Sequence, residues 1–412
     1  MINVTTLYCG LDTTGDPLRY GHRRGPGHGA PHATEREAHD VPASASQRRP
    51  VVVWTMSRRC NLHCVHCYSD SANQEYAGEL TLPEAKAMLA DLADFAIPAL
   101  LLSGGEPLAH PHFFELAETA RALGLRLTLS TNGTLITPET AARIQQTGFS
   151  YVGISFDGLG KINDQFRGQR GAFEKALAGL RNLKAVGQKV GLRFTLTRRN
   201  FEALPQIFEL VEREGIDRVC FYHLVYSGRG SRLATDDLSH AETRRALDLI
   251  CGWAASVNPA LKGGVNRDGK RVDVLTVDNH ADGVYLYLKL LRERAAFARQ
   301  TWAFLEWNGG GANSSGVGIA NIDSCGNVHP DQFWQTHTLG NVRVRPFSAI
   351  WTDPRDPLLA GLRNRLPLLT GRCGECRWNE VCGGSFRVRA LQASGDPWAP
   401  DPACYLTEEE IA

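Results

Sequence analysis

The sequence has no excess of either charge sign and no long apolar run. Its 45 Lys and Arg residues balance 44 Asp and Glu residues, for a formal net charge of +1. No basic tract is interleaved with aromatic residues, so nothing indicates a nucleic-acid partner. The longest apolar runs, such as residues 97–102, are much too short to span a bilayer. The first 15 residues lack the basic and apolar regions of a signal peptide, and we therefore expect a cytoplasmic protein.

Cysteine, in contrast, is abundant, with eleven residues. In a reducing cytosol, clustered cysteines are more often metal ligands or catalytic groups than disulfides. Seven of them form two groups, Cys60, Cys64 and Cys67 near the N-terminal end, and Cys373, Cys376, Cys382 and Cys404 near the C-terminal end. The remaining four, Cys9, Cys220, Cys251 and Cys325, stand alone, and we expect them to be small buried hydrophobic residues or incidental thiols.

Apolar runs and amphipathic segments alternate between residues 51 and 222. We expect strands at 51–56, 99–102, 125–130, 151–155, 190–196 and 218–222, and helices at 82–95, 113–123, 137–148, 173–185 and 201–214. Six βα-type units in series require parallel strands with right-handed crossovers. A closed barrel needs two more units than this pattern supplies. The expected fold is therefore α/β, a partial six-stranded (β/α)6 TIM-like barrel followed by a cysteine-bearing C-terminal extension.

The expected domain organisation has four parts. Residues 1–49 form an N-terminal segment whose arm, residues 22–49, is rich in Gly, Pro and His and cannot bury enough surface to become ordered. Residues 50–226 form the barrel, 227–308 a helical connecting region, and 309–412 the cysteine-bearing C-terminal domain. The histidines of the arm, His22, His28, His32 and His39, lack a regular ligand spacing, so a mobile, solvated linker is expected.

The first cysteine group directly follows the first expected strand. In βα folds the carboxyl ends of the strands carry the chemistry. Three thiolates on a short loop, spaced CxxxCxxC, can bind three irons of a [4Fe–4S] cube and leave the fourth iron open. The alternative is a structural zinc site with His63 or His66 as the fourth ligand.

The ends of the next four strands carry further polar groups. SGGEP (103–107) follows the second strand, STNG (130–133) the third and SFDG (155–158) the fourth, and Arg193 interrupts the apolar fifth strand. Glycines let the backbone approach a ligand, and Glu106 offers a carboxylate to an ammonium group. Hydroxyl and amide groups suit a ribose, and Arg193 suits a carboxylate. A zinc site would need none of these groups.

The motifs CxxxCxxC, GGEP and STNG, each after a successive strand, together resemble the radical S-adenosylmethionine (SAM) superfamily. The resemblance implies a SAM-binding [4Fe–4S] cluster on Cys60, Cys64 and Cys67. It implies SAM contacts at Gly104, Gly105, Glu106, Asn132, Ser155 and Arg193. His66 stands where this family often has an aromatic residue near the adenine.

The second cysteine group can close a site completely. Cys373, Cys376 and Cys382, followed by Cys404 after 21 residues, resemble the SPASM/twitch extension of radical SAM enzymes. That resemblance implies an auxiliary [4Fe–4S] cluster, with a structural zinc as the alternative. A single auxiliary cluster is expected, with Cys325 unassigned, because residues 329–331 read His-Pro-Asp where a ligand cysteine is common.

Longer stretches resemble the branch of the superfamily that modifies iron tetrapyrroles. They include LYCG and LRYG, RRCNLHCVHCY, VGLRFTLTRRN, VDNHADG and DQFW. The resemblance implies 12,18-didecarboxysirohaem as the substrate, the loss of its two acetate side chains to give iron-coproporphyrin III, and a low-potential electron donor. The alternatives are modification of the propionates of the same precursor for haem d1, and peptide maturation. Candidate carboxylate anchors are Arg229, Arg343 and Arg372, and candidate iron ligands are His223, His280 and His329.

Overall fold

The computed structural model describes residues 1–11, 49–258, 271–308 and 310–412. The expected mobile arm, with His22, His28, His32 and His39, lies outside the described residues, apart from its last residue. In the described part of the chain, no helix is long and apolar enough to cross a membrane.

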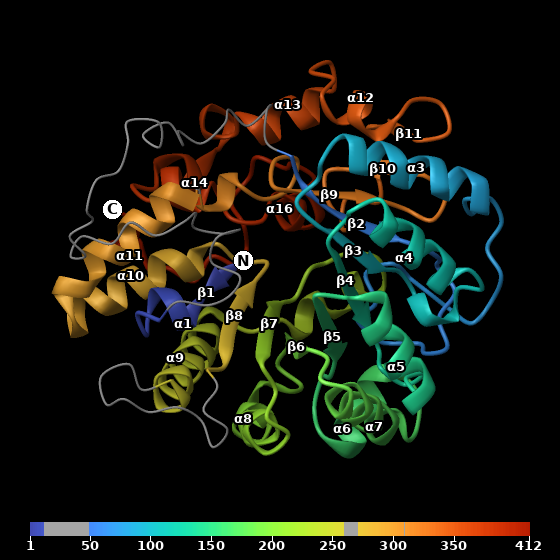
Figure 1. Cartoon of the computed structure of the whole chain (residues 1–412). Coiled ribbons are helices and arrows are strands. Elements are labelled where there is room, and N and C mark those ends of the chain that lie inside the picture. Colours follow the sequence, from blue (N-terminus) through green and yellow to red (C-terminus); the bar gives the residue numbers. More distant parts are fainter. Residues whose placement is uncertain (12–48, 259–270, 309) are drawn as a thin grey trace, which may run out of the picture.

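One eleven-stranded sheet organises the described chain, in the order β1-β8-β7-β6-β5-β4-β3-β2-β9-β10-β11. All neighbours from β8 through to β9 pair in parallel, and β1, β10 and β11 add antiparallel edges. In Figure 1 the parallel strands follow an arc, and helices cover its outer side. The strands are β1 (Ile2–Asn3), β2 (Val51–Thr55), β3 (Leu100–Ser103), β4 (Leu127–Thr131), β5 (Tyr151–Ser155), β6 (Val190–Leu196), β7 (Arg218–His223), β8 (Asp273–Val277), β9 (Ile319–Ile322), β10 (Asn327–His329) and β11 (Gly340–Asn341).

The helices of the outer layer alternate with these strands. The capping box predicted at Thr81 and Glu84 begins α3, and Gly148 ends α5 in the left-handed conformation. The longer helices are α3 (Leu82–Asp94), α4 (Phe113–Ala122), α5 (Pro138–Thr147), α6 (Gly160–Arg167), α7 (Ala172–Ala185), α8 (Leu204–Arg213), α9 (His240–Val257), α10 (Ala281–Glu293), α11 (Ala295–Asn308) and α16 (Arg387–Ser394). Shorter ones are α1 (Val4–Leu7), α12 (Phe347–Trp351), α13 (Pro357–Arg363), α14 (Gly371–Glu375), α15 (Asn379–Cys382), α17 (Glu408–Ile411), and the 3-10 turns η2 (Pro107–Ala109), η3 (Phe201–Ala203), η4 (Gly228–Asp236), η5 (Gly310–Ala312) and η6 (Leu366–Leu368).

The α/β class and the six predicted strands are confirmed, but the sheet does not end at β7. The region predicted to be a helical connection contains β8, which pairs with β7 in parallel. Its five-residue run DVLTV is short and begins with a charge, Asp273, which forms an ion pair with Arg218 at 2.5 Å. On the other side, β9 extends the parallel sheet beside β2. Helix α6 was also missed, because only eight residues form it between β5 and α7.

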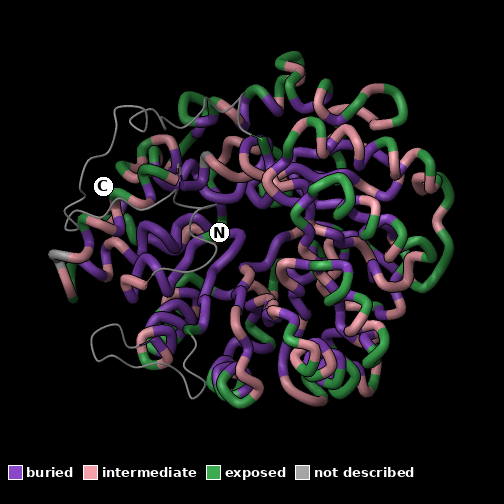
Figure 2. The backbone as a smooth tube through the Cα atoms, viewed as in Figure 1, coloured by how far each residue is buried: buried purple, intermediate pink, exposed green. Residues whose placement is uncertain are grey.

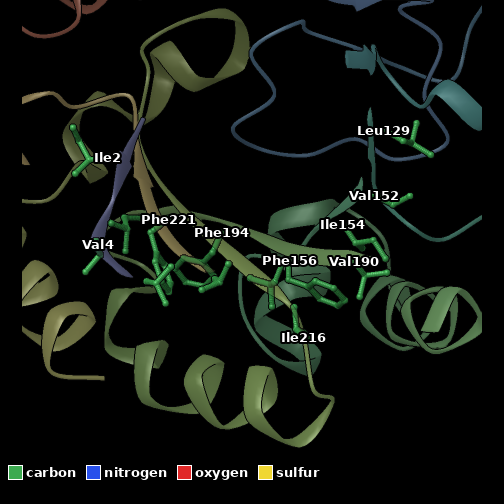
Figure 3. Close-up of a cluster of buried hydrophobic side chains, with 14 of the residues drawn as sticks. Ile2, Val4, Leu129, Val152, Ile154, Phe156, Val190, Phe194, Ile216 and Phe221 are labelled. Carbon is green, nitrogen blue, oxygen red and sulfur yellow. The ribbon is translucent and has the colours of Figure 1, made fainter. Parts of the chain in front are cut away.

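The main core lies between the sheet and its helices. Figure 2 shows buried residues along the strands and exposed residues on the outer sides of the helices. Ile2 and Val4, from the first residues of the chain, belong to the same cluster as Phe194 and Phe221 (Figure 3). The ring of Phe221 meets that of Phe194 edge to face at 6.1 Å. The N-terminal segment is therefore part of the main core.

Replacing Phe221 should destabilise the whole barrel. Phe221 is fully buried, and Phe221→Ala should lower the free energy of unfolding by about 3–5 kcal/mol because it leaves a cavity. The control is Leu291→Ala, since Leu291 is 42% exposed, and its effect should stay within about 0.5 kcal/mol. Denaturant unfolding followed by circular dichroism measures both. Equal effects of the two substitutions would contradict this core.

Candidate active site

A cavity of about 1120 Å³, including its opening to solvent, lies at the carboxyl ends of the parallel strands. Its wall contains the first cysteine group, Cys60, Cys64 and Cys67. Five of the six residues predicted to contact SAM also line it, namely Gly104, Gly105, Asn132, Ser155 and Arg193. The strand-end motifs singled out in the sequence therefore meet at one place.

The loop after β2 carries the three cysteines, and each sulfur accepts a hydrogen bond from nitrogen. The donors are Leu62 N to Cys60 Sγ at 3.4 Å, Arg167 Nη1 to Cys64 Sγ at 3.6 Å and Ser71 N to Cys67 Sγ at 3.5 Å. Such donors stabilise negative charge on sulfur and are typical surroundings of metal-bound thiolates.

Burial makes two of these sulfurs, those of Cys60 and Cys64, unfavourable as free thiolates. It raises the pKa of Cys60 to about 12, and it raises the pKa of Cys64 against the opposing charge of Arg167. A bound metal would offset that penalty. Within the described ranges, no group of three His, Cys, Asp or Glu side chains could hold a single metal ion. A [4Fe–4S] cube distributes its cysteines over separate irons. The donor set on this loop thus fits such a cluster.

Gly104 and Gly105 bring the loop after β3 into backbone contact with the cysteine loop. Gly105 N donates to Ser57 O at 2.7 Å, and Glu106 N donates to Arg59 O at 2.9 Å. A Cβ on Gly105 would lie 2.3 Å from Arg59 O, far inside contact distance. The glycines were predicted to permit approach to a ligand, and the structure shows that they permit close approach of the two loops.

Glu106 lies behind the cavity wall. It is fully buried, and its carboxylate accepts hydrogen bonds from Thr131 Oγ1 at 2.7 Å, Asn132 N at 2.8 Å and Leu108 N at 3.1 Å. Burial raises the pKa of Glu106 to about 7, and these donors oppose the rise. These hydrogen bonds join the end of β3 to the end of β4. The carboxylate itself is not part of the cavity wall.

Asn132 joins the end of β4 to the cysteine loop in turn. Its Nδ2 donates to Asn61 Oδ1 at 2.8 Å, and its Oδ1 accepts from Thr134 N at 2.9 Å. On β6, the guanidinium of Arg193 lies 4.9 Å from the ring centre of Tyr222. Polar and aromatic groups from adjacent strands thus form a continuous wall.

Asp157 is a buried anion that sequence reasoning left without a role. It forms an ion pair with Arg167 at 2.6 Å, lies 3.3 Å from His66 Nε2, and accepts from Thr195 N at 3.2 Å. Arg167 and His66 both line the cavity. Burial lowers the pKa of His66, and its ring meets Phe166 edge to face at 5.8 Å. Arg167 was missed because it belongs to α6, which was itself missed.

Arg229 alone of the three candidate anchors lines the cavity. Its Nε donates to Cys64 O at 2.8 Å and its Nη1 pairs with Asp70 at 2.9 Å, while its Nη2 is buried and has no partner in the described part of the chain. The other two candidates are structural clamps. Arg343 binds Glu84 and loop carbonyls, and Arg372 binds Glu408 and the segment of Cys404.

Of the three candidate histidine ligands, His223 alone lines the cavity. The other two are buried elsewhere, and His329 Nδ1 is bonded to His337 O at 2.7 Å. Near His223 lies Asp278, whose backbone is in the left-handed region with φ of 67°. Burial raises the pKa of Asp278 to about 7. Such a conformation is uncommon for a residue with a side chain and often marks a functional position.

The second cysteine group also comes together. Burial is the largest cause that raises the pKa of Cys382, and the charges of Cys404, Cys373 and Cys376 raise it further. The four sulfurs therefore lie near one another. Cys404 Sγ accepts from Arg372 Nη1 at 3.2 Å, and Cys376 Sγ accepts from Trp378 N at 3.4 Å. Of the lone cysteines, Cys9, Cys220 and Cys251 are buried as predicted, and Cys325 lies apart, half-buried near Ala77.

Comparison with known proteins supports these observations. A family model described as the radical SAM superfamily matches residues 54–211. The Fe-coproporphyrin III synthase of Methanosarcina barkeri is 48% identical over 418 residues, which cover 100% of this chain and 99% of that protein. The pre-heme d1 synthase of Dinoroseobacter shibae is 49% identical over 362 residues, which cover 88% and 87%.

A solved structure shares the fold at low sequence identity. Streptococcus suis SuiB, crystallised with S-adenosylmethionine, has a TM-score of 0.65 and 20% identity. The match covers 87% of this chain and 78% of SuiB. This likeness concerns the architecture alone.

Substitution of Gly105 should test the contact between the two loops. Gly105→Ala forces the cysteine loop to move, and we expect a loss of about 1–3 kcal/mol, seen as a lower melting temperature. Gly252→Ala is the control, because a Cβ there meets nothing within 4 Å and Ala favours helix α9. An unchanged melting temperature for Gly105→Ala would contradict the close approach.

Proposed function

The chain belongs to the radical SAM superfamily, and on that premise we propose that it removes the two acetate side chains of 12,18-didecarboxysirohaem to give iron-coproporphyrin III. One observation carries the proposal, namely 48% identity to an Fe-coproporphyrin III synthase along the full length of both chains. The pre-heme d1 synthase is equally similar in identity but aligns with 88% of this chain. Full-length correspondence favours the deacetylase over the enzyme that modifies propionates.

Cys60, Cys64 and Cys67 would hold the SAM-binding [4Fe–4S] cluster. With SAM bound, that cluster supplies one electron for cleavage to a 5′-deoxyadenosyl radical, which opens a homolytic route for losing an acetate from a saturated ring carbon. Gly104, Gly105, Asn132, Ser155 and Arg193 would contact SAM. Glu106 would act as a positioning residue, since it holds Thr131 and Asn132 in place from behind the wall. Arg167 would hold Cys64 and neutralise Asp157.

Cys373, Cys376, Cys382 and Cys404 would hold the auxiliary [4Fe–4S] cluster of a SPASM/twitch-like region. The support is the mutual proximity of these cysteines and the nitrogen donors that bond to Cys404 and Cys376. The sulfurs of the first group have nitrogen donors of the same kind. A low-potential electron donor would act as the redox partner, and the cytoplasm would be the location.

The substrate would occupy the side of the cavity away from the GGEP motif. A tetrapyrrole with several carboxylates needs cationic partners, and Arg229 is a cation in the cavity wall whose Nη2 lacks a partner among the described residues. Gln332 and Phe333, from the segment that contains the DQFW motif, line the same wall. This mixture of apolar, amide and guanidinium groups suits a large anionic macrocycle.

Product analysis tests the proposed reaction. The protein is reconstituted anaerobically with iron and sulfide and incubated with reductant, SAM and 12,18-didecarboxysirohaem. Mass spectrometry should find iron-coproporphyrin III, free acetate and 5′-deoxyadenosine. A product with its acetates intact and its propionates altered would instead assign the haem d1 reaction to this protein. Cleavage of SAM with the tetrapyrrole unchanged would contradict both tetrapyrrole assignments.

Arg229 should contribute to binding of the substrate's carboxylates. Arg229→Met should raise the Kd for metal-free coproporphyrin III about tenfold or more, because charge-assisted hydrogen bonds are lost. Arg229→Lys should restore part of the affinity. The control is Arg232→Met, an exposed arginine on the same turn, η4, which should bind as the unaltered protein does. Fluorescence titration measures the Kd. Equal Kd values for the two methionine variants would contradict a role of Arg229 in substrate binding.

A further inference from the structure

His223 stands where the cavity wall passes from the SAM side to the substrate side. It is the last residue of β7, and on the preceding strands β5 and β6 the wall presents Ser155 and Arg193. The side chain is 5% exposed and lines the cavity. No part of the reaction described above uses it.

One edge of the His223 ring is held by a buried chain of hydrogen bonds. Nε2 of His223 lies 2.9 Å from Asp282 Oδ2, and Tyr405 donates its hydroxyl to Asp282 Oδ1 at 2.7 Å. Asp282 and Tyr405 are both almost completely buried. Because an ionised carboxylate only accepts, a neutral His223 ring in this contact carries its proton on Nε2 and keeps the lone pair of Nδ1.

The second ring nitrogen of His223 is open to a ligand. Nδ1 has no hydrogen bond to any described part of the chain. In the described part of the chain, the ring nitrogens that are both buried and without a partner belong to His66 and His280. Nδ1 of His223 also lacks a partner, but it is not among these buried atoms. Nδ1 of His223 is therefore accessible from the cavity that this residue lines. A histidine whose other nitrogen donates to a carboxylate is the usual form of a metal ligand.

Three other aromatic side chains of the wall, those of His66, Tyr68 and Tyr222, are less suited to bind a metal. His66 is next to Cys67 in the cysteine loop, and its Nδ1 is buried. The hydroxyl of Tyr68 is bonded to Ser103 Oγ at 3.3 Å, and the ring of Tyr222 is occupied by the guanidinium of Arg193. His223 thus has both an accessible donor atom and a fixed tautomer.

We propose that Nδ1 of His223 is an axial ligand to the iron of the tetrapyrrole substrate, with Asp282 and Tyr405 as positioning residues. The inference rests on the proposed function in one respect, the iron tetrapyrrole itself. It also gives the C-terminal region a role in substrate binding. Tyr405 directly follows Cys404, so the segment that carries the second cysteine group orients the iron ligand through Asp282.

Binding of ferric coproporphyrin III tests the proposal without turnover. The unaltered protein should give a shifted Soret band and an electron paramagnetic resonance signal of imidazole-ligated iron. His223→Ala should lose this signature and bind the ferric probe at least about tenfold more weakly. Its Kd for metal-free coproporphyrin III should stay unchanged, and added imidazole should restore the signature. The control is His240→Ala, an exposed histidine on α9, which should keep every value.

Two milder variants keep the test decisive if His223→Ala fails to fold. Asp282→Asn should retain the signature but weaken ferric binding about tenfold, and Tyr405→Phe should weaken it less. The same signature in His223→Ala, or unchanged ferric affinity in Asp282→Asn, would overturn the proposal. If the unaltered protein releases acetate from 12,18-didecarboxysirohaem while His223→Ala keeps the iron signature, the ligand is refuted and the function stands. If no acetate is released, the function fails independently of this result.

Discussion

The site depends on the backbone contact between the loop after β2 and the loop after β3. Two hydrogen bonds, from Gly105 N and Glu106 N, join loops whose close approach leaves no room for a side chain on Gly105. Glu106 then reaches behind the wall to Thr131 and Asn132, and Asn132 returns to the cysteine loop at Asn61. This closed circuit fixes the first cysteine group relative to three strand ends. A rigid support of this kind gives a reactive site its geometry.

Two buried carboxylates fix further parts of the cavity wall. Asp157 holds Arg167 and His66 beside the cysteines, while Asp282 holds His223 in the wall and accepts a hydrogen bond from Tyr405. Each is a buried carboxylate with charged or hydroxyl partners, an arrangement stable only when the partners are well placed. The C-terminal region contributes Tyr405 to the second of these arrangements. Gln332 and Phe333 of that region also line the cavity, so the parallel sheet and the C-terminal region build it together.

The strand-end chemistry could be predicted because parallel strands place their carboxyl ends at one edge of a sheet. That rule was enough to bring Cys60, Gly104, Asn132, Ser155 and Arg193 into one wall. The position of the Glu106 side chain could not be predicted from the motif. The motif reads the same whether this side chain lies in the cavity wall or behind it. Strand β8 was missed because its short run begins with Asp273, a charge whose partner, Arg218, lies 55 residues earlier.

The buried polar pairs were also beyond prediction. His223 and Asp282 are 59 residues apart, and Asp282 and Tyr405 are 123 residues apart. No local pattern marks such contacts, and the sequence offered Arg343, Arg372, His280 and His329 as equal candidates. Only the fold separates them, since it turns these four toward structural partners or away from the cavity and leaves Arg229 and His223 in its wall.

The central claim is that one cavity holds both the SAM-binding cluster and the iron of the tetrapyrrole. Anomalous diffraction at the iron edge, from anaerobic crystals of the reconstituted protein soaked with SAM and ferric coproporphyrin III, tests it most directly. The account predicts a cluster of iron peaks at Cys60, Cys64 and Cys67 and a separate single iron beside His223 in the same cavity. A tetrapyrrole iron found outside this cavity would contradict the account.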